Sequence, residues 1–470
     1  MKAGGLIWLS AALLVWVPSF AAFAFDEAAF ISGEYDDGAT ALAGDVTPDG
    51  AQETAANDGA GTSDTSDGFR PSDSSDRLQL YGRIENQLTF VMMKDAEDRQ
   101  QKHLYDYMQL RLDMDASLTG GMELKSDGVV RLFAGDTEIS LDEVAPPETV
   151  ARALAEDPRL MALLQTPYQF ENRYWLDNAY VKIPVGDFLL TVGKQPLGQG
   201  AGYVWNPTDV FTQKDLLDPT YQQEGIIAMR LGVPMGRASL DLVLASPDDS
   251  MQHWMGGGRM MFPLGPFQFS AVSYYTRARF ADVVGSMDAV MAAAQTGQNP
   301  EDAIQIRDDK RVMFGGDMVV DIKGVRVWSE AAYNYLPSGR DWLEAEGGVE
   351  YYFPFETHLM IEYFYYERSP LQQHKQYDLN GWMNALDGHL KMLGRHFLFT
   401  ALEHQVSDFW TLGVSTFQGM SDASAMVEGD IRWSFAEGAE LWLMAAKGFG
   451  DRGDFLTNSF QSWLRLTIFY

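Results

Sequence analysis

The amino-acid sequence predicts an all-β fold, a transmembrane antiparallel up-and-down β-barrel of about 18 strands. Three observations predict it. Segments near ten residues long alternate apolar with polar side chains, the connections between them alternate between short and long, and the last segment repeats the strand pattern. In a membrane barrel such alternation turns apolar residues toward lipid and polar residues toward the interior. A barrel of 16 strands fits the same pattern.

The composition excludes several classes of protein. The chain has 66 acidic and 35 basic residues and a formal net charge of −31, which argues against nucleic acid because phosphates are neutralised by clustered Lys and Arg. Cysteine is absent, which excludes disulfides, thiolate metal sites and cysteine nucleophiles. The seven histidines are scattered and form no metal-binding motif. We therefore expect no catalytic residue, metal site or cofactor.

The chain divides into three predicted parts. Residues 1–24 are predicted to be a secretory signal peptide, because a positive Lys2 precedes an apolar stretch and Ala22-Phe-Ala24 fits the small-x-small cleavage pattern. Residues 25–76 contain few large apolar side chains and many Gly, Ser, Thr and Asp, so we expect a disordered, acidic periplasmic tether. Residues 77–470 are predicted to form the barrel.

The first strands show the alternation clearly. The first is expected over residues 77–91, and in residues 108–116 every second side chain is apolar while Arg111 and Asp113 lie on the other face. Between strands, tight turns such as Pro184-Val-Gly-Asp187 carry the Gly, Pro and Asp that hairpins need.

The connections between these hairpins are longer, and the longest are expected at 135–172, 279–309 and 369–395. Helical patterns appear in the first two, at residues 148–155 and 287–294. Short turns at one rim and long loops at the other are typical of outer-membrane barrels, where the short turns face the periplasm.

The closing strand is expected to pair with the first and so remove the last open edge of the sheet. Its outward residues occupy every second position and should face lipid; they are Leu464, Leu466, Ile468 and Tyr470. Arg465 and Thr467 lie between them and should face the interior.

One segment, residues 196–224, departs from the strand pattern. Gly193-Lys-Gln195, the glycines that follow it and Trp205-Asn-Pro-Thr-Asp209 resemble a segment of bacterial outer-membrane porin-like families, including the alginate-export-like group. The resemblance implies a channel of the Gram-negative outer membrane for passive or weakly selective passage of small hydrophilic solutes or ions. In porins the third extracellular loop often folds into the lumen, and this segment has that position in the chain. By analogy, the constriction would be lined by Lys194, Gln195, Gln199, Tyr203, Trp205, Asn206 and Asp209. The alternative is that the segment braces the inner wall.

Alternation also predicts a ladder of charged residues along the inner wall. Its members are Arg83, Glu85, Arg111, Asp113, Asp115, Arg230, Arg326, Glu330, Glu362, Arg368, Glu428, Asp430 and Arg432. Rows of opposite charge can tune the selectivity of a pore, and they also hydrate the wall of any water-filled barrel. The ladder leans acidic, unlike the basic lumen that an alginate-type exporter implies, which disfavours a polyanionic substrate.

The resemblance also implies partners. The lipid-facing residues of the closing strand, with the aromatic Tyr470 last, would form part of the signal that the barrel-assembly machinery reads. Outer-membrane lipid, lipopolysaccharide and a small solute are the other expected partners; nucleic acid is not expected. Two alternatives remain: a structural barrel that sheaths a partner such as an electron carrier, and a barrel enzyme with Ser, His and an acid at one rim.

Overall fold

The structure is a computed structural model of the chain. It describes residues 78–94, 99–165, 167–211, 224–246, 253–296, 303–369, 378–386, 388–451 and 459–470. The expected signal peptide (1–24) and tether (25–76) lie outside the described residues, as does the part of the inserted segment at 212–223.

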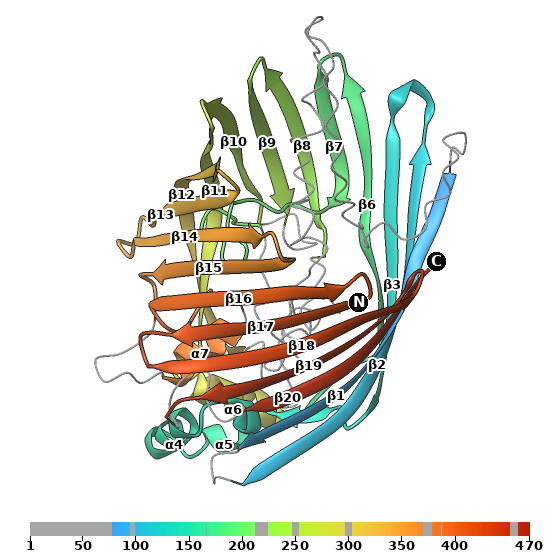
Figure 1. Ribbon diagram of the computed structural model, residues 1–470. Helices are drawn as coiled ribbons and strands as arrows, with labels where there is room; N and C mark the ends of the chain where they lie inside the picture. Colours follow the sequence, from blue (N-terminus) through green and yellow to red (C-terminus); the bar gives the residue numbers. More distant parts are fainter. Residues whose placement is uncertain are drawn as a thin grey trace, which may run out of the picture.

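A single closed barrel of 18 antiparallel strands dominates the molecule (Figure 1). Each barrel strand pairs with the next along the chain, and the last, β20, pairs with the first, β1. The count is 18, so the 16-strand alternative is wrong. Two further short strands, β4 (Glu138–Ser140) and β5 (Pro167–Gln169), pair only with each other within a long loop.

The barrel strands, in chain order, are β1 (Leu78–Lys94), β2 (Gln100–Ser117), β3 (Glu123–Gly135), β6 (Arg173–Val185), β7 (Phe188–Gln195), β8 (Ile226–Met235), β9 (Ala238–Ser246), β10 (Met255–Leu264), β11 (Phe267–Asp282), β12 (Gln305–Ile322), β13 (Val325–Tyr335), β14 (Trp342–Phe353), β15 (Thr357–Tyr366), β16 (His396–Ser407), β17 (Trp410–Gly419), β18 (Ser424–Ala436), β19 (Ala439–Phe449) and β20 (Phe460–Phe469).

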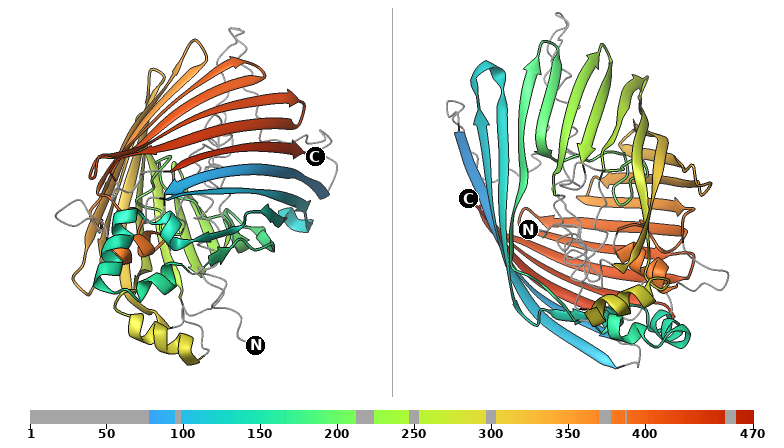
Figure 2. Two further views of the ribbon diagram at one scale, coloured as in Figure 1. Left: turned by 90° about the horizontal axis from the view of Figure 1, so that it is seen from below. Right: turned by 180° about the vertical axis from the view of Figure 1, so that it is seen from behind.

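Short turns and long loops alternate around the barrel, as the sequence predicts. Gly186, with a φ of 62°, turns the chain from β6 into β7, a conformation that favours glycine. The long loops carry helices that gather at one end of the barrel (Figures 1 and 2). These are α3 (Leu141–Val144), α4 (Pro147–Glu156), α5 (Leu160–Leu164), α6 (Met287–Thr296) and α7 (Leu379–Leu386). The helices expected at 148–155 and 287–294 are therefore confirmed as α4 and α6.

The expected loop 279–309 is too long, because β11 continues to Asp282 and β12 already begins at Gln305. In this added part of the β11–β12 pairing, Arg279 lies opposite Asp308, and the guanidinium of Arg277 donates a 2.7 Å hydrogen bond to Asp308. Cross-strand pairs of opposite charge stabilise an extended ladder, and the alternation of apolar residues does not reveal them.

The two faces of the sheet differ as a membrane barrel requires. On β20, Leu464 and Ile468 are exposed on the outside, whereas Trp463, Arg465 and Thr467 are buried inside. Other strands continue the exposed apolar belt, with outward residues such as Leu80, Ile84, Leu110, Leu112, Val349, Val414 and Leu443. Among the helices of the described residues, none is long and apolar enough to cross a membrane.

The long-loop end of the barrel has a hydrophobic core of its own. Inward-facing aromatic residues of β13 to β20 cluster there with buried residues of the loops, among them Ile139, Leu160 and Trp382. Two hydrogen bonds of one asparagine connect α7 to the end of β11. The side chain of Asn384 donates to the carbonyl oxygen of Ala281 and accepts from its N–H, at 2.7 Å each. The loops are therefore packed into the barrel mouth and narrow it.

Candidate channel lining and the segment inside the barrel

After β7 the chain turns into the barrel and lies against the inner wall formed by β13, β14 and β15. Glu362 on β15 accepts hydrogen bonds from the backbone N–H groups of Tyr203 (2.8 Å), Val204 (3.1 Å) and Trp205 (2.8 Å). Glu362 is fully buried, at 0% exposure. Hydrogen bonds from backbone N–H groups to a carboxylate are charge-assisted and stronger than neutral ones. This carboxylate therefore fixes the tip of the segment to the wall.

A second wall carboxylate holds the segment on either side of that tip. Glu330 on β13 accepts the N–H of Ala201 at 2.7 Å and the N–H of Thr208. Like Glu362, it is buried. Buried carboxylates need partners, and here the partners are backbone groups that a segment without regular structure would otherwise leave unpaired.

Glycines allow this close approach. Gly200 has a φ of 110°, which favours glycine, and a Cβ there would lie 2.6 Å from Oε2 of Glu330. At Gly202 a Cβ would lie 1.9 Å from the carbonyl oxygen of Trp205. Side chains at either position would push the segment off its carboxylates.

Trp205 anchors the segment through apolar contact. Its ring stacks on Phe364 at 5.2 Å between centroids and also contacts Phe397 (6.1 Å) and Phe417 (5.4 Å). Only 3% of Trp205 is exposed. The side chain therefore fills a pocket of the wall and does not border an opening.

Most other residues expected at the constriction also make contacts with the wall or within the segment. The hydroxyl of Tyr203 donates to Glu350 (3.1 Å) and accepts from Arg326 (3.3 Å). The amide of Gln199 donates to the hydroxyl of Tyr274 at 2.6 Å, and that of Gln195 donates to the carbonyl of Ala228 at 3.0 Å. Asp209 accepts the N–H of Gln199 (3.3 Å) and the N–H of Phe211 (2.9 Å). Tyr203 and Gln199 keep partial exposure, while Gln195, Asn206 and Asp209 are buried.

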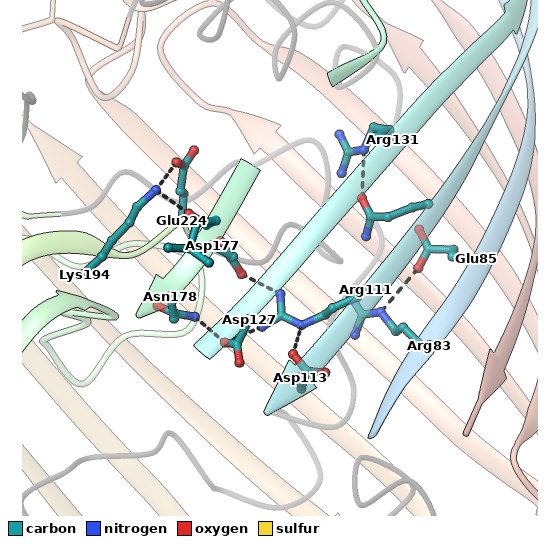
Figure 3. Close-up of polar contacts among 12 residues, drawn as sticks. Arg83, Glu85, Arg111, Asp113, Asp127, Arg131, Asp177, Asn178, Lys194 and Glu224 are labelled. Atoms are coloured by element: carbon teal, nitrogen blue, oxygen red, sulfur yellow. Dashed lines mark hydrogen bonds and ion pairs between the residues drawn. The ribbon is translucent and has the colours of Figure 1, made fainter. Parts of the chain in front are cut away.

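Lys194 does not join this group, contrary to expectation. In the β7–β8 ladder it lies opposite Ile227, whose side chain is exposed on the outer face. Its ammonium group donates to the carbonyl oxygen of Leu176 and pairs with Glu224 (Figure 3). The sequence suggested a lumen position because the lysine sits next to the glycines, but strand parity turns it outward.

Lys391 connects the inserted segment to the loops at the barrel mouth. It lies between α7 and β16, and its ammonium group donates to the carbonyl oxygens of Asn206 (2.9 Å) and Pro207 (3.4 Å). The same group lies 2.8 Å from Glu344 on β14. Lys391 therefore joins the loop before β16 both to the inserted segment and to the barrel wall.

Most residues of the expected charged ladder lie on the inner face, where they pair with other charged side chains. Arg111 on β2 lies among three carboxylates: Asp113 (2.7 Å), Asp127 (2.8 Å) and Asp177 (2.5 Å) (Figure 3). Asn178 donates to Asp127 at 2.7 Å from the neighbouring strand β6. One guanidinium thus organises an acidic cluster on the wall of β2, β3 and β6.

The remaining members of the expected ladder form smaller groups. Glu85 lies between Arg83 (4.0 Å) and Arg465 (3.7 Å), and Asp115 pairs with Lys125 at 3.5 Å. On other strands Arg230 pairs with Asp241, Arg326 with Glu350, and Arg432 with Glu403 and Asp430. Arg259 and Asp317, which the expected ladder does not include, form a further pair. Glu428 is buried on the inward face of β18.

Arg368 is misplaced in the expected ladder, because β15 ends at Tyr366. Its guanidinium donates to the backbone carbonyls of His389 (3.2 Å) and Arg279 (3.1 Å), and lies 4.6 Å from the ring centre of Trp342. Arg368 therefore connects the loop before β16 to the long-loop end of β11. The expected strand was extended two residues beyond its real end at Tyr366.

The structure adds wall residues that the expected ladder omits. Glu344, Glu346 and Glu350 all lie on the inward face of β14 and are buried. Their separations of two and four residues, which place them on one face of a strand, were visible within the expected strand. Lys391 had no such signal, because its partners are distant in sequence. Within the described residues no group of three or more His, Asp or Glu side chains is arranged to hold a metal ion.

The packed loops contain a histidine whose protonation they oppose. Burial, and then the positive charges of Arg279 and Arg368, lower the pKa of His389 to about 4. At pH values between about 4 and the unfolded-state pKa of about 6.5, His389 binds a proton more strongly when the loop is open than when it is packed. Lowering the pH from about 6.5 to about 4 should therefore open residues 388–395 progressively, by up to about tenfold in the opening constant per pH unit.

Hydrogen exchange of this loop, corrected for intrinsic pH effects, measures that change. His389→Gln is the control, since it cannot titrate and should show a flat corrected profile. A wild-type profile as flat as that of the variant would contradict the prediction.

No protein-family model and no curated protein matches the sequence. Among solved structures, the fold is similar to OccK5 (OpdH) of Pseudomonas aeruginosa, with a TM-score of 0.47 at 8% identity over 83% of this chain and 98% of that one. It is also similar to a triple mutant of the Rhodopseudomonas blastica porin, with 0.41 at 9% over 84% and 100%. A loop-deletion mutant of OmpT, an outer membrane protein of Vibrio cholerae, gives 0.40 at 11% over 84% and 99%. These likenesses are too weak to assign a function.

Proposed function

We propose that this chain is an outer-membrane channel for small hydrophilic solutes or ions. The observation that carries the proposal is the difference in polarity between the two faces of a closed sheet: the outer face has an apolar belt and the inner face has paired charges. Lipid leaves no partner for an unpaired strand edge, so closure suits a membrane. Charged groups that face inward suit an interior that contains water.

The structure also supports a narrow path. The segment held by Glu330 and Glu362 occupies space along β13 to β15, and the long loops fill the mouth at the long-loop end of the barrel. A narrow channel brings its solute close to the wall, where the sign of the fixed charge matters most. The wall carries acidic clusters around Arg111 and on β14, so we propose a preference for cations over anions.

Conductance across a planar lipid bilayer tests this function. The purified barrel should produce discrete steps, and under a potassium chloride gradient the reversal potential should have the sign of a cation-preferring pore. A matched sample unfolded by heat before addition is the control, because membrane insertion requires the folded barrel. If the folded protein inserts but raises no conductance, it is not a channel; anion preference would overturn the proposed selectivity.

A further inference from the structure

The outer face of β11 and β12 carries basic side chains where its apolar belt ends. Tyr275 on β11 and Phe314 on β12 are exposed, at 41% and 52%, on the outward face. The residues between the outward positions of β11, including Tyr274 and Thr276, are buried inside, at 0% and 2%. By this parity Arg277 follows Tyr275 on the outward face. Its cross-strand partner is Lys310, which is exposed.

This pair breaks a rule of sheet pairing. Arg277 and Lys310 lie directly opposite each other in the β11–β12 ladder, and like charges in that position destabilise a sheet. Arg279 adds a third positive charge one outward position further along β11. Asp308, opposite Arg279, bonds to Arg277 at 2.7 Å and lies 3.7 Å from His253. Asp308 thus lies beside Arg277 and His253, and Arg279 contacts that histidine at 3.4 Å.

The distance of Arg277 and Lys310 from the short-turn end of the barrel places the pair at the membrane surface. The short turn before Phe267 and the one after Ile322 mark the opposite end of these two strands. A strand rises about 3.3 Å per residue and tilts by about 40° in a membrane barrel, so Arg277 lies roughly 25 Å above Phe267. This is the height of the apolar belt of an outer-membrane barrel. The basic side chains therefore lie at the level of lipid headgroups, at the long-loop end.

We infer that Arg277 and Lys310, with Arg279 beside them, bind a phosphate group of a phosphorylated glycolipid in the outer leaflet. A guanidinium binds phosphate oxygens in a bidentate way and an ammonium group adds a point charge. Exposed Tyr275 and Phe314 lie on the apolar-belt side of the site and would contact the acyl chains of the same lipid. The inference rests on the proposed placement in an outer membrane, since the long-loop end faces the cell exterior in such barrels.

Native mass spectrometry of the purified barrel in detergent tests the inference, with added lipid A, the phosphorylated glucosamine disaccharide lipid, as the probe. Wild-type protein should retain bound lipid A, and Arg277→Gln combined with Lys310→Gln should weaken retention roughly tenfold or more, because two charged contacts are lost. Lys447→Gln is the matched control: Lys447 is an outward lysine near the long-loop end of β19, opposite apolar Val427 and Phe460. This variant should bind as the wild type does.

Three outcomes would overturn the inference: equal retention by the double variant, an equal loss in Lys447→Gln, or equal retention of lipid A stripped of its phosphates. Inorganic phosphate that competes as well as the lipid would assign the site to a free anion. The double variant removes a like-charge pair but also the Arg277–Asp308 contact, so its melting temperature in lipid-free detergent is measured beside that of the wild type. We expect the two temperatures to agree within a few degrees, which shows that a loss of lipid does not come from misfolding. Lipid binding is measured without current, so it can fail while the channel function stands, or succeed if that function fails.

Discussion

Replacing Glu362 by Gln should release the segment inside the barrel. The carboxylate of Glu362 accepts the N–H groups of Tyr203, Val204 and Trp205, and an amide removes its charge and places an NH₂ group against those donors. Hydrogen bonds to charged groups contribute about 1.5–3 kcal/mol each, and part is retained by the remaining oxygen, so we expect a loss of about 2–4 kcal/mol. Exchange of the three amide protons should accelerate by roughly 30- to 1,000-fold.

Hydrogen exchange with fragment resolution across residues 199–209 measures this effect. Glu428→Gln provides the matched control, because it makes the same change at a buried inner-wall carboxylate on β18, outside the strands that hold the segment. Single-channel conductance should rise in Glu362→Gln alone, since a detached segment no longer fixes the narrow path. Unchanged protection at residues 203–205, or equal acceleration in both variants, would show that Glu362 does not hold the segment.

Deleting Phe469 and Tyr470 should prevent assembly of the barrel. These residues complete the junction between the last and first strands: Tyr470 exchanges two backbone hydrogen bonds with Gly82, at 2.9 and 3.0 Å. Its hydroxyl group also donates to the carbonyl oxygen of Arg111 at 3.0 Å. Without them the short-turn end of the junction is unpaired, and an open strand edge is costly in lipid. Folded protein in outer-membrane fractions should fall by about tenfold or more, because the cost of several unpaired groups is large.

The amount of heat-modifiable barrel in membrane fractions measures assembly. Tyr470→Phe separates the contributions, because it keeps the aromatic ring and the backbone pairing and loses only the hydroxyl bond, worth about 1 kcal/mol. This variant should assemble nearly as well as the wild type. Normal assembly of the truncated chain would contradict the role we assign to the closing residues.

The sequence by itself determined the barrel. Period-two alternation and turn residues are local signals, so they predicted the strands, the alternation of short turns with long loops, and helices such as α4 and α6. The pairing of β20 with β1 followed from closure. Alternation also placed most charged residues on the inner face. The prediction failed for Arg368, because β15 ends before it. It also failed for Lys194, which was assigned to the interior from the neighbouring glycine-rich motif although its position in β7 faces outward.

Only the tertiary structure decided what the inner-wall residues contact. Glu362 and Glu428 have the same local pattern, yet Glu362 binds the backbone of a segment that includes Trp205, 157 residues away in sequence. The aromatic pocket for Trp205 and the bond from Lys391 to Asn206 likewise join distant parts of the chain. Alternation specifies which face of a strand a side chain occupies, because that face depends on the backbone alone. The partner of that side chain depends on which loop enters the barrel and how far it reaches. Both depend on packing between segments that are distant in the sequence, and local sequence patterns carry no information about such packing.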